Sequence, residues 1–198
     1  MRIQSSFVHM CGLAATATLL AFSGTLAATT ISEFSTADLV RHAQLGGRMS
    51  VLKKASIPGG SMYRLRIDDL LVGSLLGDEL DLTLDDSVEG MPQLQLGKSY
   101  VLFLSLANRY ERIIALIPGT IEERNGLLFS YGGQPTRLES VSSVVPSMSK
   151  GEGAGVPVTV TAHRLIPADD PMSYAEFRSS LLRVRDELLS AGALLRWK

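Results

Sequence analysis

The sequence lacks the features that identify several large classes of protein. Its 198 residues include a single cysteine, and 19 basic against 20 acidic residues leave a formal charge of -1. This near-neutral balance gives no sign of the basic surface by which nucleic-acid-binding proteins and polybasic membrane anchors are recognised. A hydrophobic content of 45% indicates a packed core and excludes a wholly disordered or collagen-like chain. At this length one domain is expected.

Residues 1–27 predict a secretory signal peptide. Arg2 is followed by an apolar stretch from Cys11 to Phe22, and the small residues of Thr25-Leu26-Ala27 supply a signal-peptidase site. This stretch is shorter than the about 20 residues that span a membrane, so a stable transmembrane anchor is not expected. We therefore expect cleavage near Ala27 and a mature protein, residues 28–198, that is secreted or periplasmic.

Cleavage at this position would remove the only cysteine of the chain. Cys11 lies at the start of the apolar stretch rather than after it, which is not the position of a lipoprotein acceptor cysteine. A mature chain without cysteine forms no disulfide and performs no thiol chemistry. Its stability must then come from the burial of ordinary side chains.

Alternation of apolar and polar residues predicts a series of β-strands within residues 43–131. The first strand, at 43–54, contains Gly46-Gly47, which indicates a bulge or a sharp bend. Asn125-Gly126 is a strong signal for a hairpin turn. The further strands are expected at 61–71, 79–85, 100–106, 112–117 and 127–131. Together they predict a barrel core in which the strand at 100–106 is covered on both faces.

The remainder of the chain changes character. Glycine, serine and proline make up half of residues 132–157, which predicts a flexible loop. Residues 158–165 alternate again and predict an edge strand. A helix at 173–190 is predicted by a capping box and by an apolar stripe formed by Tyr174, Phe177, Leu181, Val184 and Leu188. A less regular pattern indicates another helix at 31–42.

Three segments of the strand region carry a resemblance to a known fold: QLGGRMSVL, MYRLRIDDLLVGSLLGDELDLTL and LGKSYVLFLSL. Their order resembles the oligonucleotide/oligosaccharide-binding (OB) barrel of tissue-inhibitor-of-metalloproteinase (TIMP-like) and netrin-like domains. It is also similar to exported bacterial proteins of that kind, including the late MSYAEFRSSL helix. The resemblance implies a mainly β fold, an OB-like five- to six-stranded Greek-key barrel with a C-terminal α-helix, and a small binding module. The animal inhibitors act through an N-terminal cysteine, which this mature chain lacks, so no site residue is carried over.

No motif predicts a catalytic, cofactor-binding or metal-binding site. His42 and His163 lack the spacing of zinc ligands, and no serine stands in the glycine-flanked turn that would partner a histidine and an acid such as Asp169 or Asp170. The acids between 81 and 89 do not fit a calcium-binding loop, because such a loop needs a glycine where this chain has Asp86. The glycines between 151 and 155 lack the Lys-Ser/Thr of a phosphate-binding loop.

The sequence therefore favours a non-catalytic exported module that binds a protein or a small ligand of the cell envelope. Neither nucleic acid nor a cofactor is expected. One alternative is an envelope hydrolase whose polar residues, including His163 or His42, converge only in the fold. Another is a structural partner of an envelope complex, for which Leu194, Leu195 and Trp197 of the C-terminal tail are the predicted partner contact.

Overall fold

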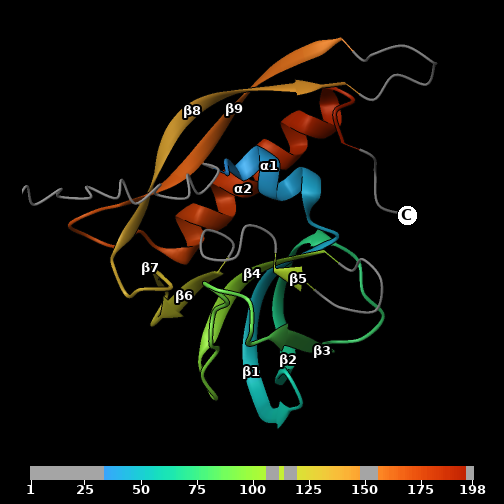
Figure 1. Ribbon diagram of the computed structural model, residues 1–198. Helices are drawn as coiled ribbons and strands as arrows, with labels where there is room; N and C mark the ends of the chain where they lie inside the picture. Colours follow the sequence, from blue (N-terminus) through green and yellow to red (C-terminus); the bar gives the residue numbers. More distant parts are fainter. Residues whose placement is uncertain (1–33, 106–111, 114–119, 148–155, 195–198) are drawn as a thin grey trace, which may run out of the picture. The chain divides into compact units, whose positions relative to one another are not determined.

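The computed structural model describes residues 34–105, 112–113, 120–147 and 156–194 (Figure 1). Contacts between Cα atoms group Ile31–Lys198 into one compact unit. The described part of the chain is mainly β, as expected. Its elements are α1 (Thr36–His42), β1 (Leu45–Ile57), β2 (Gly60–Gly73), β3 (Glu79–Asp85), β4 (Ser99–Ser105), β5 (Arg112–Ile113), β6 (Thr120–Arg124), β7 (Leu127–Ser130), β8 (Thr136–Pro146), β9 (Pro157–Pro167) and α2 (Tyr174–Ser190).

The first seven strands form one antiparallel sheet. They lie in the order β3-β2-β1-β4-β6-β7, and β5 pairs with β4 beside this path. Within the described residues no ladder joins β3 to β7, so this part of the chain shows an open sheet rather than a closed barrel. None of the described helices is long and apolar enough to span a membrane.

Strand β4 is buried on both faces, which confirms the prediction for this segment. Tyr100, Leu102 and Leu104 belong to one hydrophobic cluster, and Val101 and Phe103 belong to another. Successive side chains of a strand point to opposite faces, so β4 separates the two cores. The first core lies among β1, β2, β3 and β4 and includes Leu80, Leu82 and Leu84, the strictly alternating residues of β3.

The predicted bend of the first strand is confirmed. The pairing of β1 with β2 shifts register between Gly46 and Gly47 and again at two later positions. A Cβ atom at Gly47 would lie 2.1 Å from the carbonyl oxygen of Asp69, so a side chain has no room there. Glycine is thus required because the backbone of β2 approaches closely.

The Asn125-Gly126 turn is confirmed as well. Asn125 has φ 53° and Gly126 has φ 81°, the paired positive values of a type I′ hairpin turn. The turn connects β6 to β7, and β6 was not among the predicted strands. Of the strand expected at 112–117, the structure describes only the residues of β5; residues 114–119 lie outside the described part.

The flexible loop expected at 132–157 is corrected by the structure. Strand β8 occupies Thr136–Pro146 and pairs with β9 without a bulge, from Thr136↔Pro167 to Pro146↔Pro157. The edge strand expected at 158–165 lies within β9. The glycine, serine and proline content wrongly indicated a loop, because apolar side chains of β8, among them Val145, pack into the same hydrophobic cluster as Val101 and Phe103. Residues 148–155 lie outside the described part.

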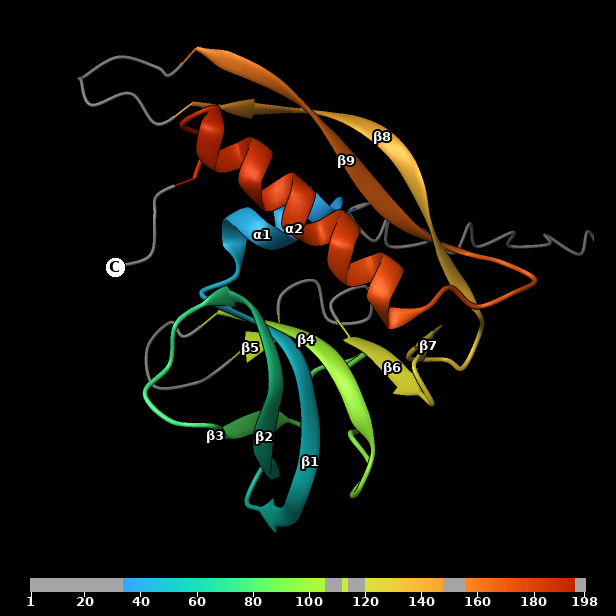
Figure 2. The same cartoon turned by 180° about the vertical axis from the view of Figure 1, so that it is seen from behind.

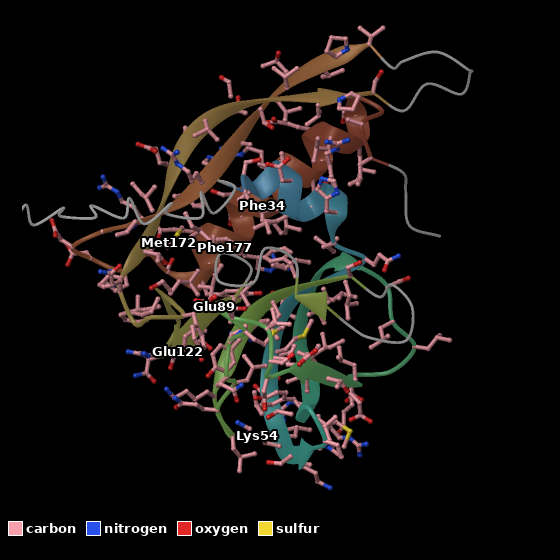
Figure 3. All side chains as sticks on the ribbon, viewed as in Figure 1. Phe34, Lys54, Glu89, Glu122, Met172 and Phe177 are labelled. Atoms are coloured by element: carbon pink, nitrogen blue, oxygen red, sulfur yellow. The ribbon has the colours of Figure 1, made fainter. Side chains whose placement is uncertain are left out.

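The second core is the cluster that contains Val101 and Phe103 of β4. It joins the β8–β9 hairpin and both helices to one face of the sheet (Figures 2 and 3). Helix α2 begins after Ser173, whose side chain and that of Glu176 form the predicted capping box. Its five stripe residues, Tyr174, Phe177, Leu181, Val184 and Leu188, are all buried. Helix α1 is shorter than expected because Ser35 caps it at Thr36.

Candidate functional site

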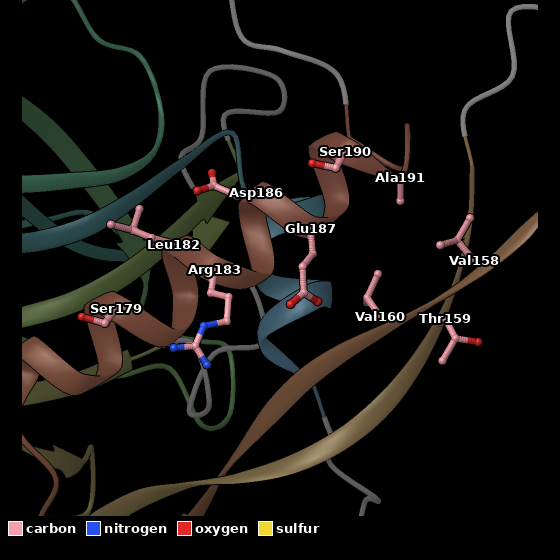
Figure 4. Close-up of a pocket in the computed structure, with 10 residues that line it drawn as sticks. All are labelled: Val158, Thr159, Val160, Ser179, Leu182, Arg183, Asp186, Glu187, Ser190 and Ala191. Atoms are coloured by element: carbon pink, nitrogen blue, oxygen red, sulfur yellow. The ribbon is translucent and has the colours of Figure 1, made fainter.

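A groove lies between the β8–β9 hairpin and α2 (Figure 4). Its upper part, of about 800 Å³, runs between Val158–Val160 of β9 and the C-terminal half of α2. Its lower part, of about 600 Å³, lies between the start of β8 and the N-terminal half of α2. Ser179 and Arg183 line both parts, so the two hollows adjoin.

The helix presents a polar stripe to this groove next to its buried apolar stripe. Ser179, Arg183 and Glu187 follow one another at intervals of four residues, which places them on one side of the helix. Val158 and Val160 of β9 face them across the upper part (Figure 4). Both walls combine apolar and polar groups, because Thr159 lies between the two valines and Leu182 and Ala191 line the helix side.

His163 is the sequence candidate that the structure places in the groove. It lies directly opposite Ser140 across the hairpin, and its backbone N–H donates to Thr36 Oγ1 at 2.9 Å. Its Nδ1 atom is buried without a hydrogen-bond partner. Burial lowers the pKa of His163 below its ordinary value, and the positive charge of Arg183 lowers it further, against an opposing effect of Glu187.

The other groups considered for catalysis do not join His163. His42 is exposed in the last turn of α1, and Asp169 and Asp170 are exposed between β9 and α2. Within the described residues no carboxylate is hydrogen-bonded to the His163 ring. The arrangement lacks the acid that orients the base of a hydrolytic triad.

The acids between 81 and 89 have local partners. Asp81 accepts two hydrogen bonds from Arg64, at 2.9 and 3.0 Å, and these hold the pKa of Asp81 below its usual range. Asp85 accepts from the backbone and hydroxyl of Ser87. No group of three or more potential metal ligands occurs among the described residues.

Glu122 is a charged side chain that sequence reasoning missed. It lies on β6 with only 6% of its side chain exposed, between Lys98 Nζ at 2.7 Å and Arg124 Nη2 at 2.6 Å (Figure 3). The hydrogen bond from Arg124 lowers the pKa of Glu122 against the effect of burial, and Lys98 adds to the lowering. Its pairing with Arg124 is local, but no local pattern could have revealed its burial or its pairing with Lys98, which belongs to a different part of the chain.

The predicted partner contact at the C-terminus is described for one residue only. Leu194 is 7% exposed and belongs to the second core, so its side chain is not part of an exposed apolar surface. Leu195 and Trp197 lie outside the described residues.

Comparison with known proteins identifies no relative of this chain. No protein-family model, no curated protein and no solved structure matches it. The resemblance to TIMP-like and netrin-like domains therefore stays a prediction, and functional inference rests on the groove itself.

Proposed function

We propose that the protein is an exported, non-catalytic binding module whose groove receives an extended segment of another envelope protein. The observation that carries this proposal is the hollow between β9 and α2, with Val158 and Val160 on one wall and Ser179, Arg183 and Glu187 on the other. Binding sites combine an apolar lining with a few polar groups in this way, so that burial gives affinity and the polar groups give specificity.

The length of the groove favours an extended chain over a compact small molecule. Its lining residues on α2 run from Ala175 to Ala191, which corresponds to about 24 Å at a helical rise of 1.5 Å per residue. An extended peptide of about seven residues covers that distance at ~3.3 Å per residue. A partner segment of this length would contact both parts of the groove.

The surroundings of His163 support binding rather than hydrolysis. A general base needs a partner that holds its ring in the reactive tautomer, and the described residues supply none to Nδ1. The three serines of the lower part stand on two different walls, Ser140 on β8 and Ser179 and Ser180 on α2. They suit hydrogen bonding to a ligand that lies between the walls.

We further propose that β1 to β5 are arranged as an OB-like barrel. Strand β1 pairs with both β2 and β4, and β3 pairs with β2, as the central strands of such a barrel do. Residues of β3 and β5 also lie within 8 Å of one another, Cα to Cα. Nuclear Overhauser contacts between the backbones of β3 and β5 would support closure, and their absence would contradict it.

The proposed location, secreted or periplasmic, rests on residues 1–27. N-terminal sequencing of the protein isolated from its producing cells tests it. A chain that begins at Ala28 or Thr29 in the exported fraction agrees with the proposal. An intact Met1 terminus in the cytosolic fraction contradicts it.

Selection from a phage-displayed library of random nonapeptides tests the binding function. Peptides enriched on the wild-type protein should lose binding to Ser179→Trp, because Ser179 is exposed and lines both parts of the groove. Binding should persist with the control Leu76→Trp, whose side chain is fully exposed on the β2–β3 loop. Failure to enrich any peptide, or equal binding to both variants, would overturn the proposal.

A further inference from the structure

We infer that the segment held in the groove carries a carboxylate group, which Arg137 and Arg183 bind beside His163. The partner is then an acidic segment rather than a purely apolar one. This inference rests on the proposed function, because it names the chemistry of the ligand for that same groove.

Two arginines that make no ion pair line the lower part of the groove. Six other arginines, on β2, β6, β9 and α2, form an ion pair with an acid within the described residues: Arg64, Arg66, Arg124, Arg164, Arg178 and Arg185. In the same part of the chain Arg41, Arg48, Arg137 and Arg183 form none, and of these four only Arg137 and Arg183 line the groove. Arg137 belongs to β8 and Arg183 to α2, the two elements between which the lower part lies. A carboxylate between them would receive charge-assisted hydrogen bonds from both sides.

The arginines have neighbouring hydroxyl donors that are not otherwise used. The hydroxyls of Ser140, Ser179 and Ser180 line the same part of the groove and make no hydrogen bond to the described residues. An anion is the ligand that this set of donors fits best, since each of its oxygens accepts several hydrogen bonds.

The single acid that lines the lower part does not neutralise the arginines. Glu176 is occupied by the helix cap, where its Oε2 accepts from the Ser173 backbone N–H at 2.9 Å and from the Ser173 hydroxyl at 2.8 Å. The lower part therefore keeps a positive excess toward any ligand. Attraction between this excess and a negatively charged segment would also speed its association.

The upper part of the groove is lined by two acids besides Arg183, and this difference from the lower part sets the direction of the segment. Asp186 and Glu187 line it, and Asp186 alone is paired, with Arg185 at 3.1 Å. An acidic residue placed there would be repelled. The segment should thus carry its acid at the lower end and a neutral or basic residue about seven positions away.

Peptide selection on two forms of the protein tests the inference. Peptides enriched on the wild type should share Glu or Asp near one end, and this preference should disappear on the double variant Arg137→Gln/Arg183→Gln. For a single enriched peptide, replacing its acid by the amide should weaken binding by about two- to fivefold, as expected for exposed ion pairs. Both arginines are exposed, so the variant should keep the folding of the wild type. Arg66→Gln, which removes an exposed arginine of β2, serves as the control.

The possible outcomes separate this inference from the proposed function. Peptides that are displaced by Ser179→Trp but show no acidic preference overturn the inference and leave the binding function standing. An acidic preference that survives in the double variant overturns the assignment to Arg137 and Arg183. If no peptide is enriched, both the inference and the proposed function fail.

Discussion

The hydroxyl of Tyr174 donates a hydrogen bond of 2.9 Å to the carboxylate of Asp69 and so joins the first turn of α2 to β2. Arg178 Nε donates to the same oxygen at 2.8 Å, and the guanidinium of Arg48 lies 4.8 Å from the centre of the Tyr174 ring. Burial and the bond to Asp69 raise the pKa of Tyr174 well above its ordinary value, so the hydroxyl stays protonated and donates. This joint, made by Asp69, Tyr174, Arg178 and Arg48, holds α2 against the sheet, and α2 is the helical wall of the groove.

Removing the acceptor of this joint should destabilise the protein. Asp69→Ala should lower the free energy of unfolding by about 1–3 kcal/mol, because the buried Tyr174 hydroxyl is left without a partner. Tyr174→Phe should cost about 1 kcal/mol, since Arg178 still satisfies Asp69. Urea unfolding measures both. Asp81→Ala, which breaks an exposed ion pair, is the control and should change stability by less than about 0.5 kcal/mol. Equal effects of Asp69→Ala and Asp81→Ala would show that the joint has no special role.

The buried Glu122 should make stability depend on pH. Its pKa in the folded protein lies below the ordinary 4.5, so its ion pairs stabilise the fold fully above pH 4.5 and are lost as the pH falls through the folded-state pKa. Wild type should exceed Glu122→Gln in unfolding free energy by about 1–2 kcal/mol at pH 7. The difference should shrink toward zero between pH 4.5 and pH values below the folded-state pKa.

Unfolding curves at pH 7, 5 and 3 measure this difference. Glu122 is the acid of the group, so protonation of its carboxylate is what removes the ion pairs as the pH falls. A difference that stays constant from pH 7 to pH 3 would contradict the assigned role of Glu122.

The close approach at the β1 bulge predicts a strong effect of a small substitution. Gly47→Ala places a methyl group against the backbone of Asp69 and Leu70, with no flexible side chain to give way. We expect a loss of about 1–3 kcal/mol in unfolding free energy, as for other overpacked positions. Gly132→Ala is the matched control, because the nearest atom to its added Cβ would be a serine oxygen at 3.9 Å. Similar stability of the two variants would argue against the described register.

Two adjacent valines test whether β8 is an ordered strand. Val145 is 1% exposed and Val144 is 67% exposed, as expected of neighbours that point to opposite faces. Val145→Asp should destabilise by about 3 kcal/mol or more because it buries an unpaired charge, whereas Val144→Asp should be nearly neutral. Thermal unfolding compares the two. If residues 136–146 were a loop instead, neither substitution would matter.

Local patterns were sufficient where an element packs through one regular face. Leu80, Leu82 and Leu84 keep a period of two, and the helix stripe from Tyr174 to Leu188 keeps its helical spacing, so both elements were recognised. Strand β8 was not, because Leu138 and Val141 pack into the same core although they lie on opposite faces of the strand. The twist of the two-stranded ribbon turns first one face and then the other toward the helices (Figures 1 and 2). Such a strand has no period of two over its full length.

The candidate site could be predicted only in part. His163 was noted from the sequence, but its position beside Arg137 and Arg183 depends on the pairing of β8 with β9 and on the packing of α2. An unpaired arginine is a property of the fold, since the sequence contains enough acids to neutralise every one of its bases. The groove therefore appears only when three separate segments are brought together.

The second core has a consequence for how the chain reaches its native state. Helix α1, the first described element, packs against α2, the last, and Ser35 bridges to Arg164 of β9. Contacts between such distant residues close large loops and form slowly. A chain that emerges with its N-terminus first cannot complete the burial of Leu39 and Val40 until α2 has followed, because the same core includes residues of α2. The nascent protein should thus expose these apolar side chains until α2 has been synthesised, an interval in which holding factors would protect it.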